Sequence, residues 1–327
     1  MSRLRLATWN IRYDVQPDSI PLSASLAALP DPLLPPRALP VGEQPWSARR
    51  VPVARALFVS QFDLAGFQEA LVRQVRDLVD LLGSDYAWVG VGRDDGVSAG
   101  EFSPIFYRRS AFTLLVTDTF WLSQAPFTPG SCFPGAGCSR LATFAHFRLV
   151  VAPPTSTGEL ILFNTHLDHV SDAQRRLGAA MLLHRARYEA HAKPGVPIFV
   201  TGDFNSTAIG DDDGAYAVLT GKQPGPPVPD DFARRFPLPA RGSGGPGNSE
   251  LVMVDMRVAA PRLHVGGEWA TFTGFEQRMS DNECIDFVFG RSDGGWCAKG
   301  VFVHGNITDE GMLASDHRLV VADVVLP

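Results

Sequence analysis

Hydrophobic segments of this chain repeatedly run straight into acidic, amide or imidazole side chains. Such segments lie at residues 4–10, 160–169, 198–205, 285–289 and 315–317. Strands that are apolar along their whole length are typical of sheets covered on both faces. Polar groups at the ends of such strands stand on the rim of a rigid sheet, where functional side chains are often presented. The pattern therefore predicts a layered α/β fold with one shared site at a sheet edge.

Helices are expected between these strands. Apolar residues recur at helical spacing over 53–57 and 71–82, where Gly83 supplies a stop signal, and residues 172–193 form the clearest helix. Apolar runs predict strands at 62–67, 102–108, 117–122, 143–151, 198–200, 287–289, 301–303 and 319–325.

Two segments interrupt this pattern. Residues 16–45 contain eight prolines, which exclude a long helix or a central strand, so this segment is predicted to be a surface loop. It is either a lid over the site or an ordered surface loop without a function. Residues 221–248 are rich in Pro and Gly and predict a second irregular loop. Layered α/β enzymes of about this length often fold as one unit, so we expect a single domain over 1–327 with these two insertions.

The composition is that of a globular enzyme, with 45% hydrophobic and 20% charged residues. A net charge of −6 argues mildly against a nonspecific nucleic-acid binder, whose surface usually carries a basic stripe. No apolar run is long enough to span a membrane, and no signal-peptide core follows Met1, so an intracellular, cytoplasmic protein is expected. The four cysteines are too few for a disulfide scaffold; Cys132 and Cys138 flank a tight loop, and free thiols are favoured over a local bridge.

The same motifs, read in order together with the segment Gly66-Phe67-Gln68-Glu69, resemble the endonuclease/exonuclease/phosphatase superfamily. This group includes DNase-like and apurinic endonucleases, deadenylases, sphingomyelinases and inositol polyphosphate phosphatases. The matching motifs run from Leu4 to about Val325 and so cover essentially the whole chain. The resemblance implies a four-layer α/β/β/α sandwich, in which two packed mixed β-sheets are flanked by helices and the site lies at one end.

Phosphoester hydrolysis needs a cation to neutralise the phosphoryl oxygens and an oriented water. Mg²⁺ is usually held by one or two carboxylates together with waters and substrate oxygens. By the resemblance, Glu69 is the principal metal carboxylate, with Asn10 beside it as an oxygen ligand or water anchor, and Asp316 lies near the metal or its waters. Mn²⁺ is an alternative ion. Without the resemblance, Glu69 reads equally well as a cap of the following helix and Asn10 as a turn residue.

Catalytic roles are assigned to residues of the other strand ends. Asp203 and Asn205 are two apart, so in an extended segment both side chains point to one face. The resemblance implies that Asp203 orients and deprotonates water while Asn205 holds a phosphate oxygen; an Asx-turn pair is the alternative. His317 is expected to bind the scissile phosphate as an imidazolium paired with Asp286, or else to be a core histidine satisfied by a carbonyl. His166 matches a family histidine that contacts the phosphate.

A further set of residues is considered for substrate contact: Arg93, Glu101, Tyr107, Asp168, His169 and Trp269. Arg93 could grip a substrate phosphate and Glu101 could support the metal or a sugar hydroxyl, although a surface ion pair beside a turn at 94–96 is the alternative. Tyr107 falls where several relatives carry a site tyrosine. Asp168 and His169 either reach the substrate or only hold their loop.

Two kinds of supporting residue complete this set. Arg175 or Arg176 could hold the loop that carries Asp168 by an ion pair. Aromatic residues considered for the cleft are Trp46, Trp121, Trp269 and Phe272, with core packing as the alternative for each.

The sequence therefore predicts a Mg²⁺-dependent phosphoester hydrolase that acts on a small phosphorylated metabolite, sugar or lipid headgroup by direct attack of water. The alternative enzyme is a nuclease or deadenylase acting on single-stranded nucleic acid. A non-catalytic binding protein on the same fold is the second alternative, although such proteins usually lose the metal Glu, the Asp-x-Asn pair or the final His, all of which are present here. No oligomeric state is predicted.

Overall fold

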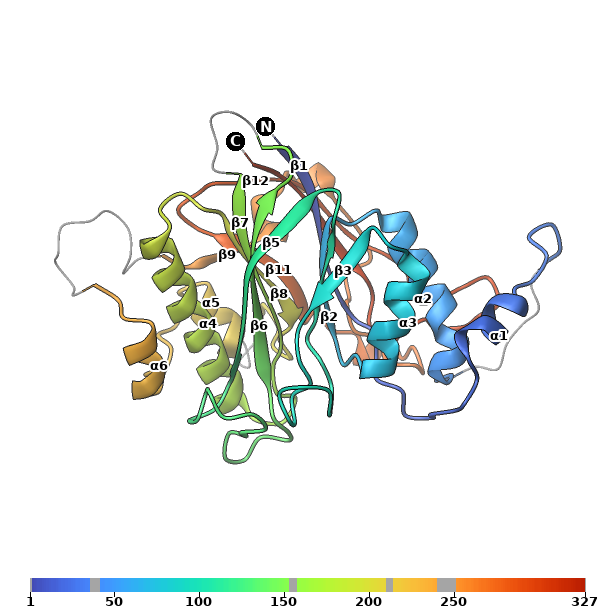
Figure 1. Ribbon diagram of the computed structural model, residues 1–327, viewed down its shortest axis with the longest axis horizontal. Coiled ribbons are helices and arrows are strands. Elements are labelled where there is room, and N and C mark those ends of the chain that lie inside the picture. The colour runs from blue at the N-terminus through green and yellow to red at the C-terminus, as the bar shows by residue number, and fades with distance from the viewer. Residues whose placement is uncertain (1, 36–41, 153–157, 210–213, 240–250, 327) are drawn as a thin grey trace.

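Two mixed β-sheets pack face to face and are flanked by helices on their outer sides (Figure 1). The computed structural model describes residues 2–35, 42–152, 158–209, 214–239 and 251–326. The first sheet contains β1 (Ser2–Asn10), β2 (Leu64–Gln68), β3 (Tyr86–Val89), β4 (Ile105–Arg108), β10 (Val265–Gly267), β12 (Cys297–Val303) and β13 (Val320–Leu326). The second contains β5 (Phe112–Trp121), β6 (Leu141–Leu149), β7 (Glu159–His166), β8 (Ile198–Asp203), β9 (Met253–Asp255) and β11 (Asp286–Arg291).

The first sheet places strands from the two ends of the chain, β1 and β13, side by side at its centre, whereas the second sheet keeps β5 to β8 in sequence order. The seven-stranded sheet has the order β10-β12-β13-β1-β2-β4-β3, and the six-stranded sheet has the order β5-β6-β7-β8-β11-β9. The helices are α1 (Leu22–Ala27), α2 (Trp46–Ser60), α3 (Val72–Leu82), α4 (Asp172–Ala192), α5 (Gly214–Leu219), α6 (Asp230–Arg235) and α7 (Met256–Ala259). In Figure 1 α2 and α3 cover the outer side of the first sheet, and α4 covers that of the second. The predicted four-layer sandwich is confirmed.

Hydrophobic side chains form three layers between these four. One lies between the sheets, one between the first sheet and helices α2 and α3, and one between the second sheet and α4. The continuous apolar sequence of strand β7 follows from burial on both of its faces. Leu160 and Leu162 face the layer between the sheets, whereas Ile161 and Phe163 face the layer under α4. Burial of this apolar surface on both faces is the main term that stabilises the sandwich.

Helix α4 follows the expectation for residues 172–193 closely. Ser171 caps its first turn because its side chain accepts a hydrogen bond from the Gln174 backbone, and Asp172 adds a negative charge at the N-terminal end. The helix ends just before the Pro194-Gly195 pair, which cannot continue it. It therefore lies firmly on the second sheet.

The described part of the proline-rich segment is anchored to the helices of the first sheet. Arg50 on α2 is buried and donates to the carbonyls of Ile20 (3.2 Å) and Pro21 (2.7 Å), and Arg73 on α3 donates to the carbonyl of Asp18 (2.6 Å). A short helix, α1, forms within the segment. The interpretation as a lid stays untested, because residues 36–41 lie outside the described part.

The second irregular segment contains one helix that its composition did not indicate. Helix α6 starts after Pro229, and its Phe232 packs against Phe120, with ring centroids 5.0 Å apart. Phe236, which follows the helix, packs on Phe232 at the same centroid distance, 5.0 Å. Burial of these two rings stabilises a turn and a half of helix in a segment rich in Pro and Gly. Residues 240–248 of this loop lie outside the described ranges.

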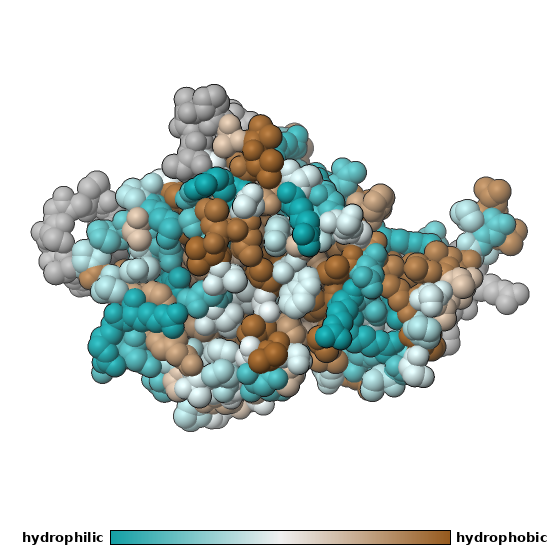
Figure 2. Space-filling model, viewed as in Figure 1, coloured by the Kyte–Doolittle hydropathy of each residue, from teal (hydrophilic) through white to brown (hydrophobic). Residues whose placement is uncertain are grey.

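The surface shown in Figure 2 is mixed in character, with hydrophobic side chains gathered over α1 and α2. Leu34, Phe58 and Val59 are among the exposed hydrophobic residues of this region. All four cysteines are free thiols, as expected. In the part of the chain that the structure describes, no helix is both long and apolar enough to cross a membrane.

Candidate active site

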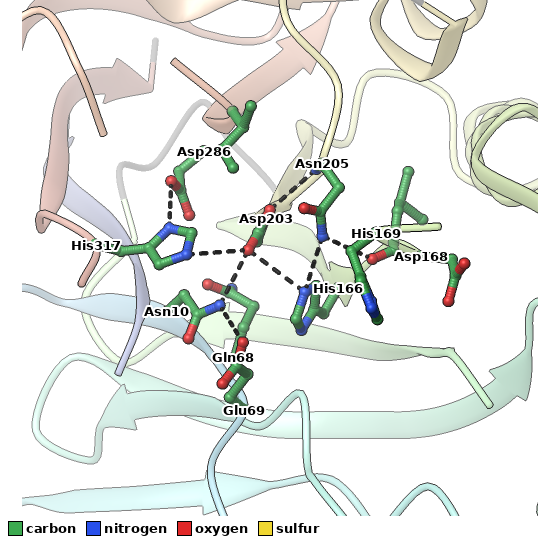
Figure 3. Close-up of polar contacts among 12 residues, drawn as sticks. Asn10, Gln68, Glu69, His166, Asp168, His169, Asp203, Asn205, Asp286 and His317 are labelled. Atoms are coloured by element: carbon green, nitrogen blue, oxygen red, sulfur yellow. Dashed lines mark hydrogen bonds and ion pairs between the residues drawn. The ribbon is translucent and has the colours of Figure 1, made fainter. Parts of the chain in front are cut away.

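Strand register places Asp203 between two other polar residues of the second sheet. Strand β8 ends at Asp203, which lies opposite His166 of the parallel strand β7 and opposite Asp286 of the antiparallel strand β11. The three side chains stand at one edge of the sheet, because the carboxyl ends of β7 and β8 and the start of β11 meet there. The carboxylate of Asp203 lies at the centre of Figure 3.

The amide of Asn10 joins this edge to the first sheet. Asn10 ends β1 and pairs with Gln68 at the end of the parallel strand β2, so Glu69 follows immediately beside it. Its Nδ2 donates to Glu69 Oε1 (2.9 Å) and to Asp203 Oδ2 (3.0 Å). One buried amide therefore holds a carboxylate from each sheet in place (Figure 3).

His317 completes the cluster from the loop before β13. Its Nδ1 lies 2.9 Å from Asp286 Oδ2, and its Nε2 lies 3.6 Å from Asp203 Oδ2. The backbone of the loop is held by two side-chain hydrogen bonds: Trp9 Nε1 donates to the His317 carbonyl (3.0 Å), and Ser315 Oγ donates to the Asn10 carbonyl (2.7 Å). The imidazole is thus fixed between two carboxylates (Figure 3).

Burial and nearby charge shift the pKa values of Asp203 and His317 strongly. Burial and the negative charge of Asp286 raise the pKa of Asp203 to about 7. Burial alone would lower the pKa of His317, but the charges of Asp286 and Asp203 raise it to about 10. His317 is therefore a cation at neutral pH, which suits it to stabilise a phosphoryl group.

His166 and Asn205 form the other side of the site. Asn205 Nδ2 lies 3.1 Å from His166 Nε2 and donates to the Leu167 carbonyl (3.0 Å), while the Asn205 backbone donates to Asp203 Oδ1 (3.0 Å). Burial, with the nearby charge of Arg140, lowers the pKa of His166 well below its usual value. His166 is therefore neutral, and its buried Nδ1 has no hydrogen-bond partner among the described residues.

Glu69 and Asp316 are the carboxylates that fit a divalent metal best. Both are buried or nearly so, and the charge of Glu69 adds to burial in raising the pKa of Asp316. Arg12 lies close to both, with guanidinium nitrogens 3.7 Å from Glu69 and 3.9 Å from Asp316, beyond hydrogen-bond reach, and the charge of His317 also acts on both. Two neighbouring carboxylates with such loose compensation are a donor set that suits Mg²⁺. The side-chain oxygen of Asn10 already accepts a hydrogen bond from the Arg12 backbone (2.9 Å). In this structure Asn10 therefore contacts one carboxylate of each sheet through its Nδ2 donor and orients both.

A second acidic group also has the spacing of a metal site. Ligand atoms of Asp203, Asp286 and His317 lie within 4.8 Å of one another. Both nitrogens of His317, however, are directed at the two carboxylates, through a hydrogen bond to Asp286 (2.9 Å) and a longer ion pair with Asp203 (3.6 Å). Mg²⁺ prefers oxygen ligands, so we favour Glu69 and Asp316 as its holders.

Three residues of the site have left-handed backbone conformations that side chains other than glycine rarely adopt. Their φ angles are +57° at Arg12, +61° at Glu69 and +44° at Asn205. Each such conformation costs about 1 kcal/mol or more, and clusters of them are typical of functional sites. Each of these residues lies one or two positions after a strand end, and its side chain contacts another residue of the site.

The structure places Asp168 and His169 in a loop-holding arrangement. Asp168 is fully buried and accepts hydrogen bonds from the backbones of Gly137 (3.0 Å) and Ser171 (2.8 Å). Burial raises the pKa of Asp168, but these backbone donors lower it more. Arg175 supports the same loop through the Asp168 carbonyl (3.0 Å). His169 is exposed, and its Nδ1 accepts from Arg140 (3.2 Å).

Of the other substrate candidates, Arg93 and Glu101 lie next to the cluster and two residues do not. Arg93 and Glu101 form an ion pair of 2.5 Å beside His166 in a shared cavity. Tyr107 instead packs between the sheets against Phe147, with ring centroids 5.1 Å apart. Trp269 is 62% exposed, and no contact with the cluster is seen among the described residues.

The remaining aromatic candidates divide in the same way. Phe272 contacts the His317 ring, with centroids 4.9 Å apart. Trp46 is fully buried and donates to Asp77 (2.9 Å) on the outer side of the first sheet, so it belongs to the core. Trp121 is buried and donates to the Arg93 carbonyl (2.7 Å), which supports the loop that carries Arg93.

Sequence reasoning missed three arginines that shape the site. Arg12 faces Glu69 and Asp316, and Arg140 lies between Glu101 and His169. Arg49 is buried and donates to carbonyls of both loops that carry the cluster, those of Ile11 (2.8 Å) and Ala314 (3.0 Å). The nearness of Arg12 to the motif residue Asn10 is the single sequence signal that could have pointed to any of them.

The sequence profile of the Endonuclease/Exonuclease/phosphatase family matches residues 7–317. The chain belongs to this family. Members of the endonuclease/exonuclease/phosphatase family are typically phosphoester hydrolases and generally depend on a divalent metal. The chain is similar to a solved endonuclease/exonuclease/phosphatase from Bacteroides vulgatus, with 30% identity, a TM-score of 0.73 and 100% of each chain covered.

Two further solved structures of the endonuclease/exonuclease/phosphatase fold are similar at lower identity. A mannosyl-6-phosphatase of Bacteroides thetaiotaomicron shares 23% identity with a TM-score of 0.70, covering 99% of this chain and 100% of the other. The human Nocturnin catalytic domain, solved with a bound sulfate, shares 14% with a TM-score of 0.59, covering 99% and 95%. Both show the fold alone. No curated protein sequence matches the chain.

Proposed function

We propose that the chain is a Mg²⁺-dependent phosphoester hydrolase that acts on a small phosphorylated molecule by direct attack of water. One observation carries this proposal: the Asn10 amide ties Glu69 of one sheet to Asp203 of the other, beside a charged His317. Such a junction offers a metal carboxylate, a proton acceptor and a phosphate-binding cation within one hydrogen-bonded group. These are the parts that in-line hydrolysis of a phosphoester requires.

Asp203 is the residue that we assign to the attacking water. Its Oδ1 accepts from the Asn205 backbone and its Oδ2 from Asn10, so the carboxylate is fixed at the centre of the cluster. It orients the water and accepts its proton. His317 donates to a phosphoryl oxygen as negative charge develops, and Asp286 holds the imidazole ring in the required orientation.

Neutral His166 contributes a donor on the opposite side of the phosphoryl group, and the Asn205 amide, bonded to His166 and to the Leu167 carbonyl, orients its ring. Glu69 and Asp316 would hold Mg²⁺, with Mn²⁺ as a substitute. The bound ion would neutralise phosphoryl oxygen charge and stabilise the leaving oxygen. Asn10 keeps the metal carboxylate apart from Asp203, so that the two acids keep separate roles.

The substrate class rests on charge. The chain carries a net charge of −6, which disfavours long nucleic acids because their binding depends on basic phosphate contacts. A structural neighbour is named as a mannosyl-6-phosphatase, which accords with a small phosphorylated substrate, although its 23% identity supports the fold alone. Another neighbour is a TDP2 of D. rerio complexed with single-stranded DNA, so nucleic acid belongs in any substrate panel.

The test is hydrolysis of a mixed panel by the wild-type protein with Mg²⁺, Mn²⁺ or EDTA. The readouts are inorganic phosphate from the monoesters, p-nitrophenol from the p-nitrophenyl esters and shortened strands from the oligonucleotide. The panel contains p-nitrophenyl phosphate, bis-p-nitrophenyl phosphate, hexose phosphates, nucleotides, phosphocholine and a single-stranded oligonucleotide. We expect turnover that EDTA abolishes, with a small monoester or headgroup as the best substrate. Preference for the oligonucleotide would establish the nuclease alternative. Folded protein that binds Mg²⁺ but hydrolyses no phosphoester would contradict the proposal.

A further inference from the structure

A short segment, Thr271 to Thr273, lies beside the two parts of the chain that carry Asp286 and His317. It belongs to no helix or strand itself. Both threonines are buried. The residue between them exchanges two backbone hydrogen bonds with Glu283, each 3.0 Å long. The segment is therefore fixed in place next to the start of β11 on one side and the loop before β13 on the other.

The Thr271 hydroxyl satisfies the backbone at the start of β11. Its oxygen accepts hydrogen bonds from the backbone N–H groups of Ile285 and Asp286, both 3.0 Å long. Strand β9 pairs with β11 only over residues 289–291, so at the start of β11 a side chain takes the place of a neighbouring strand. Buried backbone N–H groups are nearly always hydrogen-bonded. Loss of the hydroxyl would therefore leave two donors without an acceptor at the point where Asp286 enters the strand.

The same segment holds the loop that carries His317. The Thr271 carbonyl accepts a hydrogen bond from the Arg318 backbone (2.6 Å), and the Thr273 backbone donates to the Asp316 carbonyl (2.9 Å). The two bonds join the segment to the residues directly before and after His317. The backbone of His317 is thus held on both sides by residues that also fix the start of β11.

These contacts determine the geometry of the bond between His317 and Asp286. The Nδ1 of the imidazole lies 2.9 Å from Asp286 Oδ2 (Figure 3). The Phe272 ring packs on the imidazole, with centroids 4.9 Å apart, and limits its rotation. Hydrogen bonds weaken steeply as their distance and angle depart from the optimum. Because Thr271 reaches both partners through its hydroxyl and its carbonyl, a shift at this residue would misalign the pair.

We propose that Thr271 and Phe272 are positioning residues that set the hydrogen bond between Asp286 and His317 and so aim the imidazole at the phosphoryl group. Thr271 acts through the backbone of Asp286, and Phe272 acts through the imidazole ring. The effect on turnover rests on the proposed function, whereas the effect on the hydrogen bond does not. A catalytic group that is misplaced by about 1 Å can cost about 100-fold in rate. His317 stabilises charge that develops in the transition state, so the loss should fall on kcat and not on KM.

The kinetic test compares Thr271→Val, which keeps the shape of the side chain but removes the hydroxyl, with Thr271→Ser, which keeps the hydroxyl. The control is Ser60→Ala, which removes a buried hydroxyl that donates to the Leu57 carbonyl (2.7 Å) on α2. On the best panel substrate we expect kcat to fall about 10- to 100-fold in Thr271→Val, with KM within about twofold of the wild type. Thr271→Ser should recover most of this loss, and Ser60→Ala should keep the wild-type kcat. An equal fall in Thr271→Ser and Thr271→Val, or a rise in KM alone, would overturn the assignment.

A spectroscopic measurement separates this inference from the proposed function. The buried Nδ1–H of His317 should give a downfield NMR resonance in metal-free protein labelled with ¹⁵N-histidine, assigned by its absence in His317→Gln. We expect this resonance in the wild type, in Thr271→Ser and in Ser60→Ala, and its loss or upfield shift in Thr271→Val. That result would support the positioning role even if no phosphoester were hydrolysed.

An unchanged resonance in folded Thr271→Val would overturn the proposal. If Thr271→Val does not fold, Phe272→Leu decides, because Phe272 is only half-buried and its replacement removes the ring contact with the imidazole. The resonance should then shift or broaden and kcat should fall while KM is retained. A resonance and a kcat that both match the wild type in Phe272→Leu would contradict the role of this segment.

Discussion

Asn164 offers a quantitative test of how the two sheets are held together directly behind the site. It is fully buried at the end of β7, and its Nδ2 donates to the carbonyls of Phe67 (2.8 Å) and Pro104 (2.9 Å) in the other sheet. Its Oδ1 accepts from Gln68 Nε2 (2.7 Å) and Thr201 Oγ1 (3.2 Å). The amide therefore uses all of its donors and links both sheets beside Gln68, the residue that precedes Glu69.

The expected cost of Asn164→Ala follows from these four contacts. A buried hydrogen bond contributes about 1 kcal/mol net, and a buried partner that loses its hydrogen bond costs about 1–3 kcal/mol. Thr201 keeps a second bond to the Phe163 carbonyl, and Gln68 keeps one to Thr8, so the full sum does not apply. We expect a loss of about 3–5 kcal/mol in the free energy of unfolding. The isosteric Asn164→Asp should lose at least as much, because a carboxylate would then face two carbonyls.

Urea unfolding followed by circular dichroism measures this loss. Thr113→Ala, at an exposed position of β5, is the control and should change stability by less than about 0.5 kcal/mol. Because a domain is stable by only about 5–15 kcal/mol, both Asn164 variants should unfold at much lower urea concentration. A loss below about 1 kcal/mol in both would refute the view that this amide joins the sheets.

Further predictions concern the loops, acid stability and the metal. Arg49→Met should lose about 3–5 kcal/mol in urea unfolding, because buried carbonyls of both site loops lose their donor; a change under about 1 kcal/mol would contradict this. Burial raises the pKa of Asp323, but the hydrogen bond from Arg5 lowers it below 3.8. The pairing therefore adds up to about 1 kcal/mol to the free energy of unfolding above pH 3.8, and this stabilisation is lost as the pH falls through the pKa of the folded state. Asp323→Asn should therefore show a weaker loss of stability in acid than the wild type, and an unchanged acid profile would contradict the pairing. Mg²⁺ at 100 times its Kd should stabilise the wild type by about 2.7 kcal/mol in thermal unfolding, and Glu69→Gln with Asp316→Asn should abolish this shift; a shift that persists would place the metal elsewhere.

The strand ends of the site could be predicted because their signal is local. An apolar run followed by Asp203 or by His166 is visible in the sequence, and the register of β7 against β8 then places the two side by side. Periodicity shows that β7 is covered on both faces, but it does not show which elements cover it. The four-layer arrangement was therefore predicted from the family resemblance.

Other contacts depend on geometry that the sequence does not encode locally. Tyr107 and Phe106 alternate along β4, and only the packing of the sheets decides that Tyr107 faces the other sheet and Phe106 faces the helices. Arg140 has no motif, because its role arises where the start of β6 meets the turn that carries Glu101. Arg12 faces Glu69 and Asp316 from a left-handed backbone, a conformation that propensity alone would not predict.

The most direct test of the central claim is phosphate release from the best panel substrate by wild type, Asp203→Asn and Glu69→Gln. Asp281→Asn, which changes an exposed acid whose side chain accepts from Ser280, serves as the control. The account predicts Mg²⁺-dependent turnover that falls at least about 100-fold in the first two variants and is retained in the control, with all proteins folded. Turnover that survives in Asp203→Asn, or that proceeds unchanged in EDTA, would contradict it.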